Sequence, residues 1–113
     1  MPASKPFVYS AEAEVEDLGE GIKRQILGYG QELMVVKAWF EEGSVGYLHK
    51  HPHAQVTYVE SGEFEVTVDN DVQLLSAGDS FYIAPNLLHG ATCKKAGVLI
   101  DTFSPCRQDF LEG

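Results

Sequence analysis

Residues 43–62 of the chain read GSVGYLHKHPHAQVTYVESG and contain three of its four histidines. Two of them, His49 and His51, are separated by one residue, so an extended strand would point both imidazoles to the same side. Imidazoles aimed at one point predict a metal site. The same alternation would also align His53 and Gln55, but the proline after His51 interrupts a regular strand. Strand periodicity therefore does not choose between His53 and Gln55 as a further ligand.

The rest of the chain consists of short apolar or alternating runs separated by Gly, Pro, Asn and Asp. Such runs predict β-strands, and the breaks between them predict turns. No stretch keeps a helical period, so little helix is expected apart from a short turn at Cys106–Leu111. Hairpin turns are expected at Glu60–Glu63 and Asp69–Asp71. The expected strands are Ile22–Leu27, Leu33–Phe40, Tyr47–Lys50, Ala54–Ser61, Glu63–Asp69, Val72–Leu75, Ser80–Ile83, Gly90–Cys93 and Val98–Ser104.

Strands this short and this numerous predict an all-β sandwich or barrel. A chain of 113 residues is expected to form a single domain over 1–113, with its core at about 22–104 and an extension at either end. Phe64, Val66 and Val68 alternate along one predicted strand, so they would supply apolar side chains to one interior face.

The last predicted strand carries an acidic residue on an otherwise apolar face. Leu99, Asp101 and Phe103 alternate along this strand, so they point to the same side. A carboxylate among apolar neighbours is costly to bury unless it has polar partners. Asp101 is therefore expected either to face solvent or to lie in a polar cavity.

The chain contains 8 basic and 17 acidic residues, for a net charge of −9. This balance argues against nucleic acid or an anionic membrane as a partner, because both attract basic surfaces. No apolar run is long enough to span a membrane, and the first residues lack the apolar core of a signal peptide. We therefore expect a cytoplasmic protein in which Cys93 and Cys106 are free thiols.

The glycines around the histidine segment are spaced as in the cupin family. Gly43, His49, His51, Gln55 and Gly62 stand at the positions of the first cupin motif, with Gln55 where glutamate is usual. The chain thus resembles this family, although its histidines alone would also fit a metal-free cupin in which they are structural.

A second stretch, from Gly78 to His89, resembles the second cupin motif, which ends in the fourth ligand. The resemblance implies a jelly-roll barrel, also called a double-stranded β-helix. It assigns Gln55 rather than His53 as a ligand, and leaves open whether His53 supports the site or is a bystander. The implied site holds one divalent metal ion through His49, His51, Gln55 and His89.

Three neutral imidazoles and one amide oxygen would contribute no charge to such a site. The ion would then be a stronger Lewis acid than one bound by the usual carboxylate. Imidazole ligands suit Ni, Zn, Fe and Mn, so the residues do not identify the metal.

In more detail the chain resembles the small KdgF-type cupins of pectin and alginate breakdown. The similarity covers the histidine segment, residues 85–90, and a closing segment, 97–105, which is followed by Arg107. Those cupins convert cyclic 4,5-unsaturated monouronates, the products of polyuronate lyases, to linear 4-deoxy-5-keto uronates. The resemblance therefore implies an isomerase-like, metal-dependent enzyme with a small uronate as substrate. We also expect a homodimer, because dimers cover exposed sheet edges.

The resemblance also implies roles for three residues near the end of the chain. Asp101 would move protons as a general acid and base, and Arg107 would bind the substrate carboxylate through a two-pronged contact. Phe103 would pack against the sugar ring. Each has a plainer interpretation, as a solvent-facing aspartate, a surface cation and a core aromatic residue.

Two other functions remain open from the sequence. One is a different metal-dependent cupin enzyme, such as a dioxygenase or a sugar isomerase, and the other is a non-enzymatic cupin that binds a sugar or a metal. Oxygen consumption would favour a dioxygenase, and tight binding without turnover would favour a binding protein. Tyr47, Tyr58 and Tyr82 can line a pocket or pack elsewhere, and the sequence does not decide which.

Overall fold

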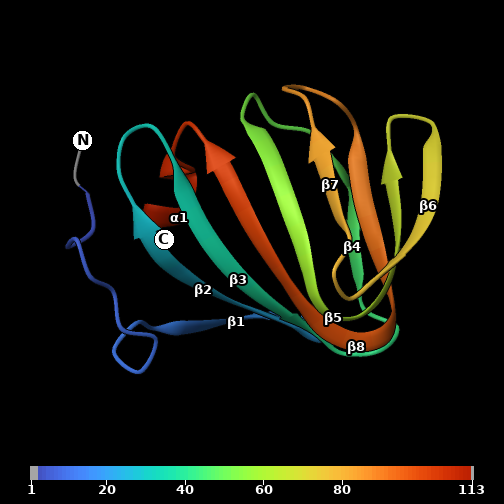
Figure 1. Cartoon of the computed structure of the whole chain (residues 1–113), viewed down its shortest axis with the longest axis horizontal. Coiled ribbons are helices and arrows are strands. Elements are labelled where there is room, and N and C mark those ends of the chain that lie inside the picture. The colour runs from blue at the N-terminus through green and yellow to red at the C-terminus, as the bar shows by residue number, and fades with distance from the viewer. Residues whose placement is uncertain (1–2, 113) are drawn as a thin grey trace.

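The computed structural model describes residues 3–112, which form one antiparallel sheet of eight strands, bent over on itself into a two-layered barrel (Figure 1). The predicted all-β barrel with little helix is confirmed. The elements in chain order are β1 Val15–Gly19, β2 Ile22–Tyr29, β3 Met34–Phe40, β4 Val45–His49, β5 Ala54–Val68, β6 Asp71–Ser76, β7 Ser80–Ile83, β8 His89–Ser104 and α1 Gln108–Leu111.

Two long strands, β5 and β8, run through both layers of the barrel (Figure 1). In the first layer, the first half of β5 lies between β7 and the second half of β8. On the other side of β8 this layer continues with β3, β2 and β1, in that order. In the second layer, the second half of β5 lies between β6 and the first half of β8, which also pairs with β4. Strand β8 therefore carries His89 in one layer and Asp101 in the other.

The bend in these strands depends on two glycines that lie against each other. Gly62 in β5 has a φ of 84°, a backbone conformation that favours glycine. A β-carbon added to it would lie 2.6 Å from the Cα of Gly97 in β8, and one added to Gly97 would collide with the carbonyl oxygen of Ser61. The hairpin turn expected at Glu60–Glu63 is therefore wrong, because these residues form an irregular step within one continuous strand.

Other element boundaries also differ from the sequence prediction. The segments expected at 90–93 and 98–104 are two parts of the single strand β8. Strand β1 lies outside the core expected at about 22–104, and its side chains are mostly exposed, so it lacks the alternation that marks a half-buried strand. The tail forms α1, which is shorter than the expected turn. Among residues 3–112, no helix is long and apolar enough to cross a membrane.

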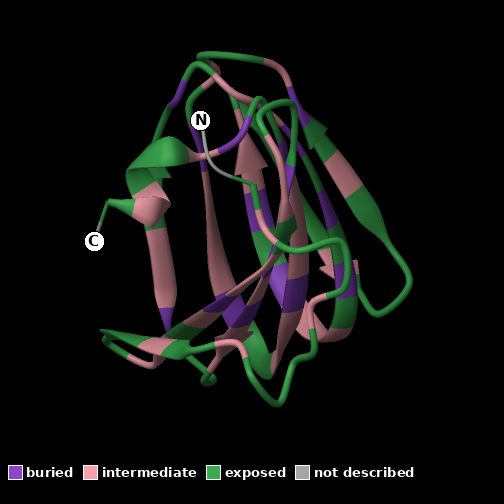
Figure 2. Cartoon of the chain, turned by 90° about the vertical axis from the view of Figure 1, so that its left-hand side faces the viewer, coloured by how far each residue is buried: buried purple, intermediate pink, exposed green. Residues whose placement is uncertain are grey.

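Most of the buried residues lie in the strands (Figure 2), and the apolar ones include two packed clusters. Phe64 and Val66 are buried as the alternation predicts, and Val68 packs against them while partly exposed. Both cysteines are free and buried, Cys93 in the first cluster and Cys106 in the second. The first cluster is Val59, Phe64, Val66, Cys93 and Leu99, and the second is Met34, Val36, Phe103 and Cys106.

Candidate metal centre

Three histidines from two parts of the chain come together between the two layers. His49 ends β4 and His89 begins β8, and the two are direct partners in the pairing of these strands. His51 lies in the loop between β4 and β5. One ring nitrogen of each lies within 4.8 Å of the others. The structure therefore brings the histidines of the two sequence motifs into a single cluster.

Each ring of the cluster is oriented by the same kind of contact. Its Nδ1 donates to a main-chain carbonyl two residues away, at 2.8 Å for His49, 3.1 Å for His51 and 2.9 Å for His89. This leaves the Nε2 of each ring with its lone pair, as in histidines that bind a metal. The Nε2 of His89 is buried and has no hydrogen-bond partner among the described residues. A metal ion would satisfy this otherwise costly buried atom.

Gln55, near the start of β5, turns its side-chain oxygen toward the cluster. Its Oε1 lies 3.0 Å from the Nε2 of His51. Because the Nδ1 of His51 carries the hydrogen, both atoms present lone pairs and neither can donate to the other. A cation bound by both atoms would remove the repulsion between these two lone pairs. Three imidazoles and an amide oxygen therefore fit a divalent transition metal.

The two buried rings are held in the neutral form that a metal requires. Burial lowers the pKa of His89 to about 4 and also lowers the pKa of His51. The nearby positive charge of Arg107 acts in the same direction on both rings. At neutral pH these ligands therefore have no proton to lose before an ion binds.

The cluster borders a cavity of about 230 Å³ between the layers. Asp101 lines this cavity together with Gln55 and two of the histidines, so it takes the polar-cavity position and not the solvent-facing one. Its Oδ1 accepts a hydrogen bond of 2.6 Å from the hydroxyl of Thr57 and a longer one of 3.4 Å from the Nε2 of Gln55. Burial raises the pKa of Asp101 to about 6, although the hydrogen bond from Thr57 acts against this shift.

Thr57 is part of this site, and no sequence pattern marks it. It is fully buried, and its hydroxyl also accepts a hydrogen bond of 2.8 Å from the Nε2 of Gln55. A single threonine in a strand is common and carries no signal of its own. Its role can be recognised only in the structure, where Thr57 lies directly opposite Asp101 in the pairing of β5 with β8.

Arg107, which precedes α1, also lines the cavity. Its Nε and Nη2 donate to the two carboxylate oxygens of Asp109, at 3.0 Å and 2.8 Å. Its guanidinium lies 4.1 Å from the ring centre of Phe110 and 5.0 Å from that of Phe103. Asp109 therefore occupies the Nε–Nη2 edge of the guanidinium. A two-pronged contact with another carboxylate would have to use the Nη1–Nη2 edge. Phe103 is buried and meets His51 edge-on, with ring centres 5.7 Å apart, while still lining the cavity.

The other candidate residues lie outside the cluster. The ring of His53 packs against His51, with ring centres 5.5 Å apart, and its main-chain carbonyl accepts the hydrogen of the Nδ1 of His51. His53 therefore holds the candidate ligand His51 in place without belonging to the group of three histidines. Tyr47, Tyr58 and Tyr82 are 66%, 47% and 61% exposed, and none of them lines the cavity.

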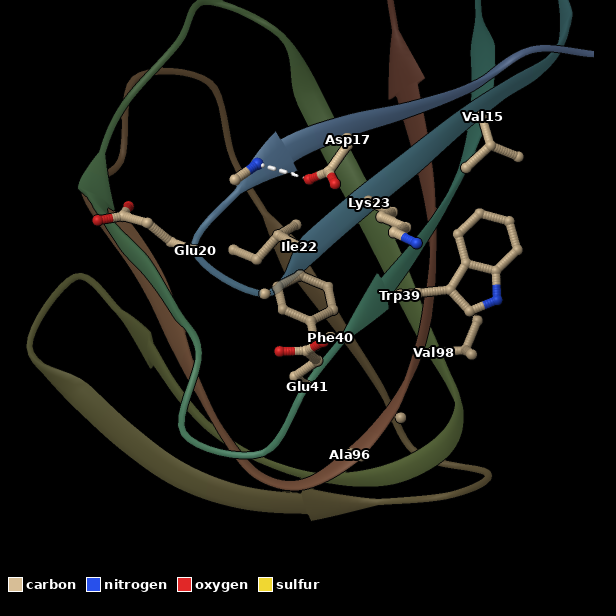
Figure 3. Close-up of a pocket in the computed structure, with 13 residues that line it drawn as sticks. Val15, Asp17, Glu20, Ile22, Lys23, Trp39, Phe40, Glu41, Ala96 and Val98 are labelled. Atoms are coloured by element: carbon tan, nitrogen blue, oxygen red, sulfur yellow. Dashed lines mark hydrogen bonds between the residues drawn. The ribbon is translucent and has the colours of Figure 1, made fainter.

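A larger hollow of about 790 Å³ lies elsewhere, where the β1–β2 turn meets the end of β3 and the bend of β8 (Figure 3). Trp39 and Val98 form part of its wall, and the carboxylate of Asp17 accepts a hydrogen bond of 2.9 Å from the main-chain nitrogen of Gly19. None of the histidines, and neither Asp101 nor Arg107, lines this hollow. The histidine cluster, Gln55 and Asp101 therefore belong to the smaller cavity.

Comparison with known proteins gives matches over most of the chain. The model of the cupin domain matches residues 38–103. The pectin degradation protein KdgF of Dickeya dadantii is 45% identical over 98 residues, which are 85% of this chain and 89% of that protein. The residues matched by the cupin model include the whole histidine cluster and Asp101.

Two solved structures match along nearly their whole length. An RmlC-like cupin from Shewanella frigidimarina is 53% identical, with a TM-score of 0.94, and the match covers 97% of this chain and 99% of that one. KdgF from Halomonas sp. is 36% identical, with a TM-score of 0.89, over 95% of this chain and 99% of that one. With matches of this length and identity, the chain belongs to the cupin family and is a cupin of the KdgF type.

Proposed function

We propose that this protein converts cyclic 4,5-unsaturated monouronates, the products of pectin and alginate lyases, to linear 4-deoxy-5-keto uronates. The observation that carries the proposal is the position of Asp101, whose carboxylate lies in the same cavity as the histidine cluster and within hydrogen-bond reach of Gln55. The similarity to two proteins named KdgF, one of them named for pectin degradation, supports the same substrate class.

The reaction is an isomerisation that needs a proton carrier. The substrate is a cyclic enol ether with a free anomeric hydroxyl and a carboxylate. When the bond between C1 and the ring oxygen breaks, the anomeric hydroxyl loses its proton and becomes an aldehyde, while the ring oxygen becomes that of an enolate. Protonation of this enolate at C4 gives the ketone at C5. One proton thus moves from the hydroxyl to C4, with no net gain or loss of atoms.

Asp101 is the carboxyl group positioned to carry that proton. It is the acidic side chain that lines the cavity, so it can take a proton from the substrate and return it at C4. A divalent metal bound by the histidines and Gln55 would supply a Lewis acid that stabilises negative charge on the departing ring oxygen. The two groups therefore provide the proton transfer and the charge stabilisation that the isomerisation requires.

Arg107 supplies the positive charge that an anionic substrate needs in this acidic protein. The chain has a net charge of −9, so a uronate meets repulsion unless a cation lies locally at the site. The Nη1–Nη2 edge of Arg107 can bind the uronate carboxylate, while Asp109 holds the other edge in place. Phe103 packs under the guanidinium and against His51, so it fixes both groups at the cavity wall.

The test is the ultraviolet absorbance of the C4=C5 double bond in unsaturated galacturonate prepared with a pectin lyase. The metal-loaded protein should accelerate the loss of this absorbance well above the spontaneous rate, and NMR should show the linear keto acid. A reaction that proceeds only at the spontaneous rate would overturn the proposal. Oxygen consumed in proportion to substrate would point to a dioxygenase, and tight binding without turnover to a binding protein.

A further inference from the structure

Thr57 stands between the candidate metal ligand Gln55 and the candidate proton carrier Asp101. Gln55 and Thr57 are two residues apart in β5, so their side chains share a face, and Thr57 is paired with Asp101 across to β8. The hydroxyl of Thr57 lies 2.8 Å from the Nε2 of Gln55 and 2.6 Å from the Oδ1 of Asp101. All three groups are therefore joined by one hydroxyl that has no access to solvent.

The chemistry of these groups allows one direction of hydrogen bonding around an ionised Asp101. A carboxylate only accepts, so the single hydroxyl hydrogen of Thr57 goes to Asp101. The hydroxyl oxygen is then left as an acceptor, and Gln55 must present its NH₂ group to it. Since an amide carries its oxygen on the opposite side, Oε1 points to His51 and the cluster, as the 3.0 Å contact shows.

We propose that Thr57 is a positioning residue that fixes the amide of Gln55 with its oxygen toward the metal and, through the same hydroxyl, fixes the carboxylate of Asp101. The proposal rests on the proposed function only for the role of Asp101. Its effect on the metal centre follows from the hydrogen bonds alone. Removing the hydroxyl leaves the amide nitrogen of Gln55 with the longer 3.4 Å contact to Asp101 as its remaining hydrogen bond.

The plainer interpretation is that Thr57 only fills space in the interior. Two substitutions separate these roles. Thr57→Val keeps the branched shape and removes the hydroxyl, whereas Thr57→Ser keeps the hydroxyl and removes a methyl group. A packing role predicts that Thr57→Ser is the more harmful change, and a positioning role predicts that Thr57→Val is.

The first measurement is metal affinity, by competition of Ni²⁺ or Zn²⁺ with a chelating dye. Partners of metal ligands typically contribute about 10–100-fold to affinity, so Thr57→Val should lose affinity in this range and Thr57→Ser should stay within a few-fold of the parent. The visible spectrum of the Co²⁺-loaded protein should change in Thr57→Val as it does in Gln55→Ala, because the amide oxygen is displaced in both. Parent-like affinity and spectrum in a folded Thr57→Val protein would overturn the proposal.

A double-mutant cycle shows whether Thr57 acts through Gln55. In the Gln55→Ala background, Thr57→Val should cause no further loss of metal affinity, because the group that it positions is absent. Losses that add in the double variant would contradict the proposal. Thr67→Val is the matched control, since it makes the same change in β5 at a residue whose side chain has no hydrogen bond to Gln55 or Asp101. If Thr57→Val does not fold, as judged by circular dichroism, Thr57→Ala replaces it in the cycle.

A kinetic measurement distinguishes this proposal from the proposed function. With unsaturated galacturonate, Thr57→Val should lower kcat more than it changes KM, and Thr57→Ser should restore kcat. If the parent protein binds the metal but does not turn over this substrate, the proposed function fails, while the affinity and spectral results still decide the role of Thr57. If the parent is active and Thr57→Val matches it in affinity and kcat, the inference about Thr57 fails alone.

Discussion

The amide of Gln55 gives the site a hydrogen-bond donor that the usual glutamate would not. Its nitrogen donates to Thr57 and approaches the Oδ1 of Asp101 at 3.4 Å. A glutamate here would place a second carboxylate beside Asp101, and the single hydroxyl hydrogen of Thr57 could serve only one of the two. Like charges this close disfavour each other. Gln55 therefore permits Asp101 to lie next to the candidate metal ligands.

Replacing Asp101 with asparagine tests proton transfer without a change in side-chain size. We expect Asp101→Asn to fold and to bind metal, but to lose about 10²–10⁴-fold in kcat, the usual contribution of a general acid or base. The measurement is the rate of absorbance loss with unsaturated galacturonate. Asp71→Asn is the matched control, because Asp71 is an exposed aspartate at the start of β6. Parent-like rates in Asp101→Asn would remove this residue from the mechanism.

Among the strands, β5 and β8 show which features the sequence could predict and which it could not. Alternation identified both halves of each strand, because each half buries one face. Continuity through Gly62 was not predictable, since a glycine after a serine is as typical of a hairpin turn as of a bend inside a strand. Its role depends on Gly97, which is distant in sequence and reaches it only through the pairing of β5 with β8.

The candidate site also has one part that the sequence predicted and another that it did not. The cupin spacing predicted the histidines and Gln55 as ligands, and strand alternation put Asp101 on one face with Phe103. The structure places all of these at one cavity apart from His51, which reaches it through the cluster. Thr57 was not predictable, because its role needs the register between β5 and β8. The pairing of Arg107 with Asp109 was missed for a similar reason, since it depends on the turn that leads into α1.

A substitution at the bend should destabilise the barrel. Gly97→Ala would push a β-carbon into the carbonyl of Ser61, so we expect a loss of roughly 1–3 kcal/mol in the free energy of unfolding, as in other overpacked interiors. Gly28→Ala is the control, because a β-carbon at Gly28 in β2 meets nothing within 4 Å, and it should change stability by about 0.5 kcal/mol or less. Urea denaturation measures both. Equal stability of the two variants would refute the importance of the glycine contact.

Over the whole molecule, the candidate metal centre draws its ligands from both layers. His49 and His89 come from the layer that contains β4, whereas Gln55 belongs to the layer that contains β7. A ligand set divided in this way exists only when both layers are folded and in register. Metal binding should therefore stabilise the native barrel by mass action, since the unfolded chain does not hold the ligands together.

Removal of the metal should lower the melting temperature. At a free metal concentration of about 100 times Kd, binding stabilises the fold by about 2.7 kcal/mol. At roughly 4 °C for each kcal/mol, this amounts to a shift of about 10 °C between metal-loaded and chelated protein. Differential scanning calorimetry with and without EDTA measures the shift. The His49→Ala/His51→Ala double variant should hold no stoichiometric metal by elemental analysis and show no response to EDTA, and full metal occupancy in that variant would disprove the site.

The place of β8 in the chain has a consequence for protein synthesis. It is the last strand, and it pairs with β3, β4 and β5. Until β8 leaves the ribosome, these three strands lack their common neighbour, and their open edges are templates for pairing with other chains. The first three ligands are already translated by then, but the fourth, His89, begins the missing strand. The candidate ligand set is thus complete only after β8 is translated, and we expect a chain that stops before β8 to aggregate rather than fold.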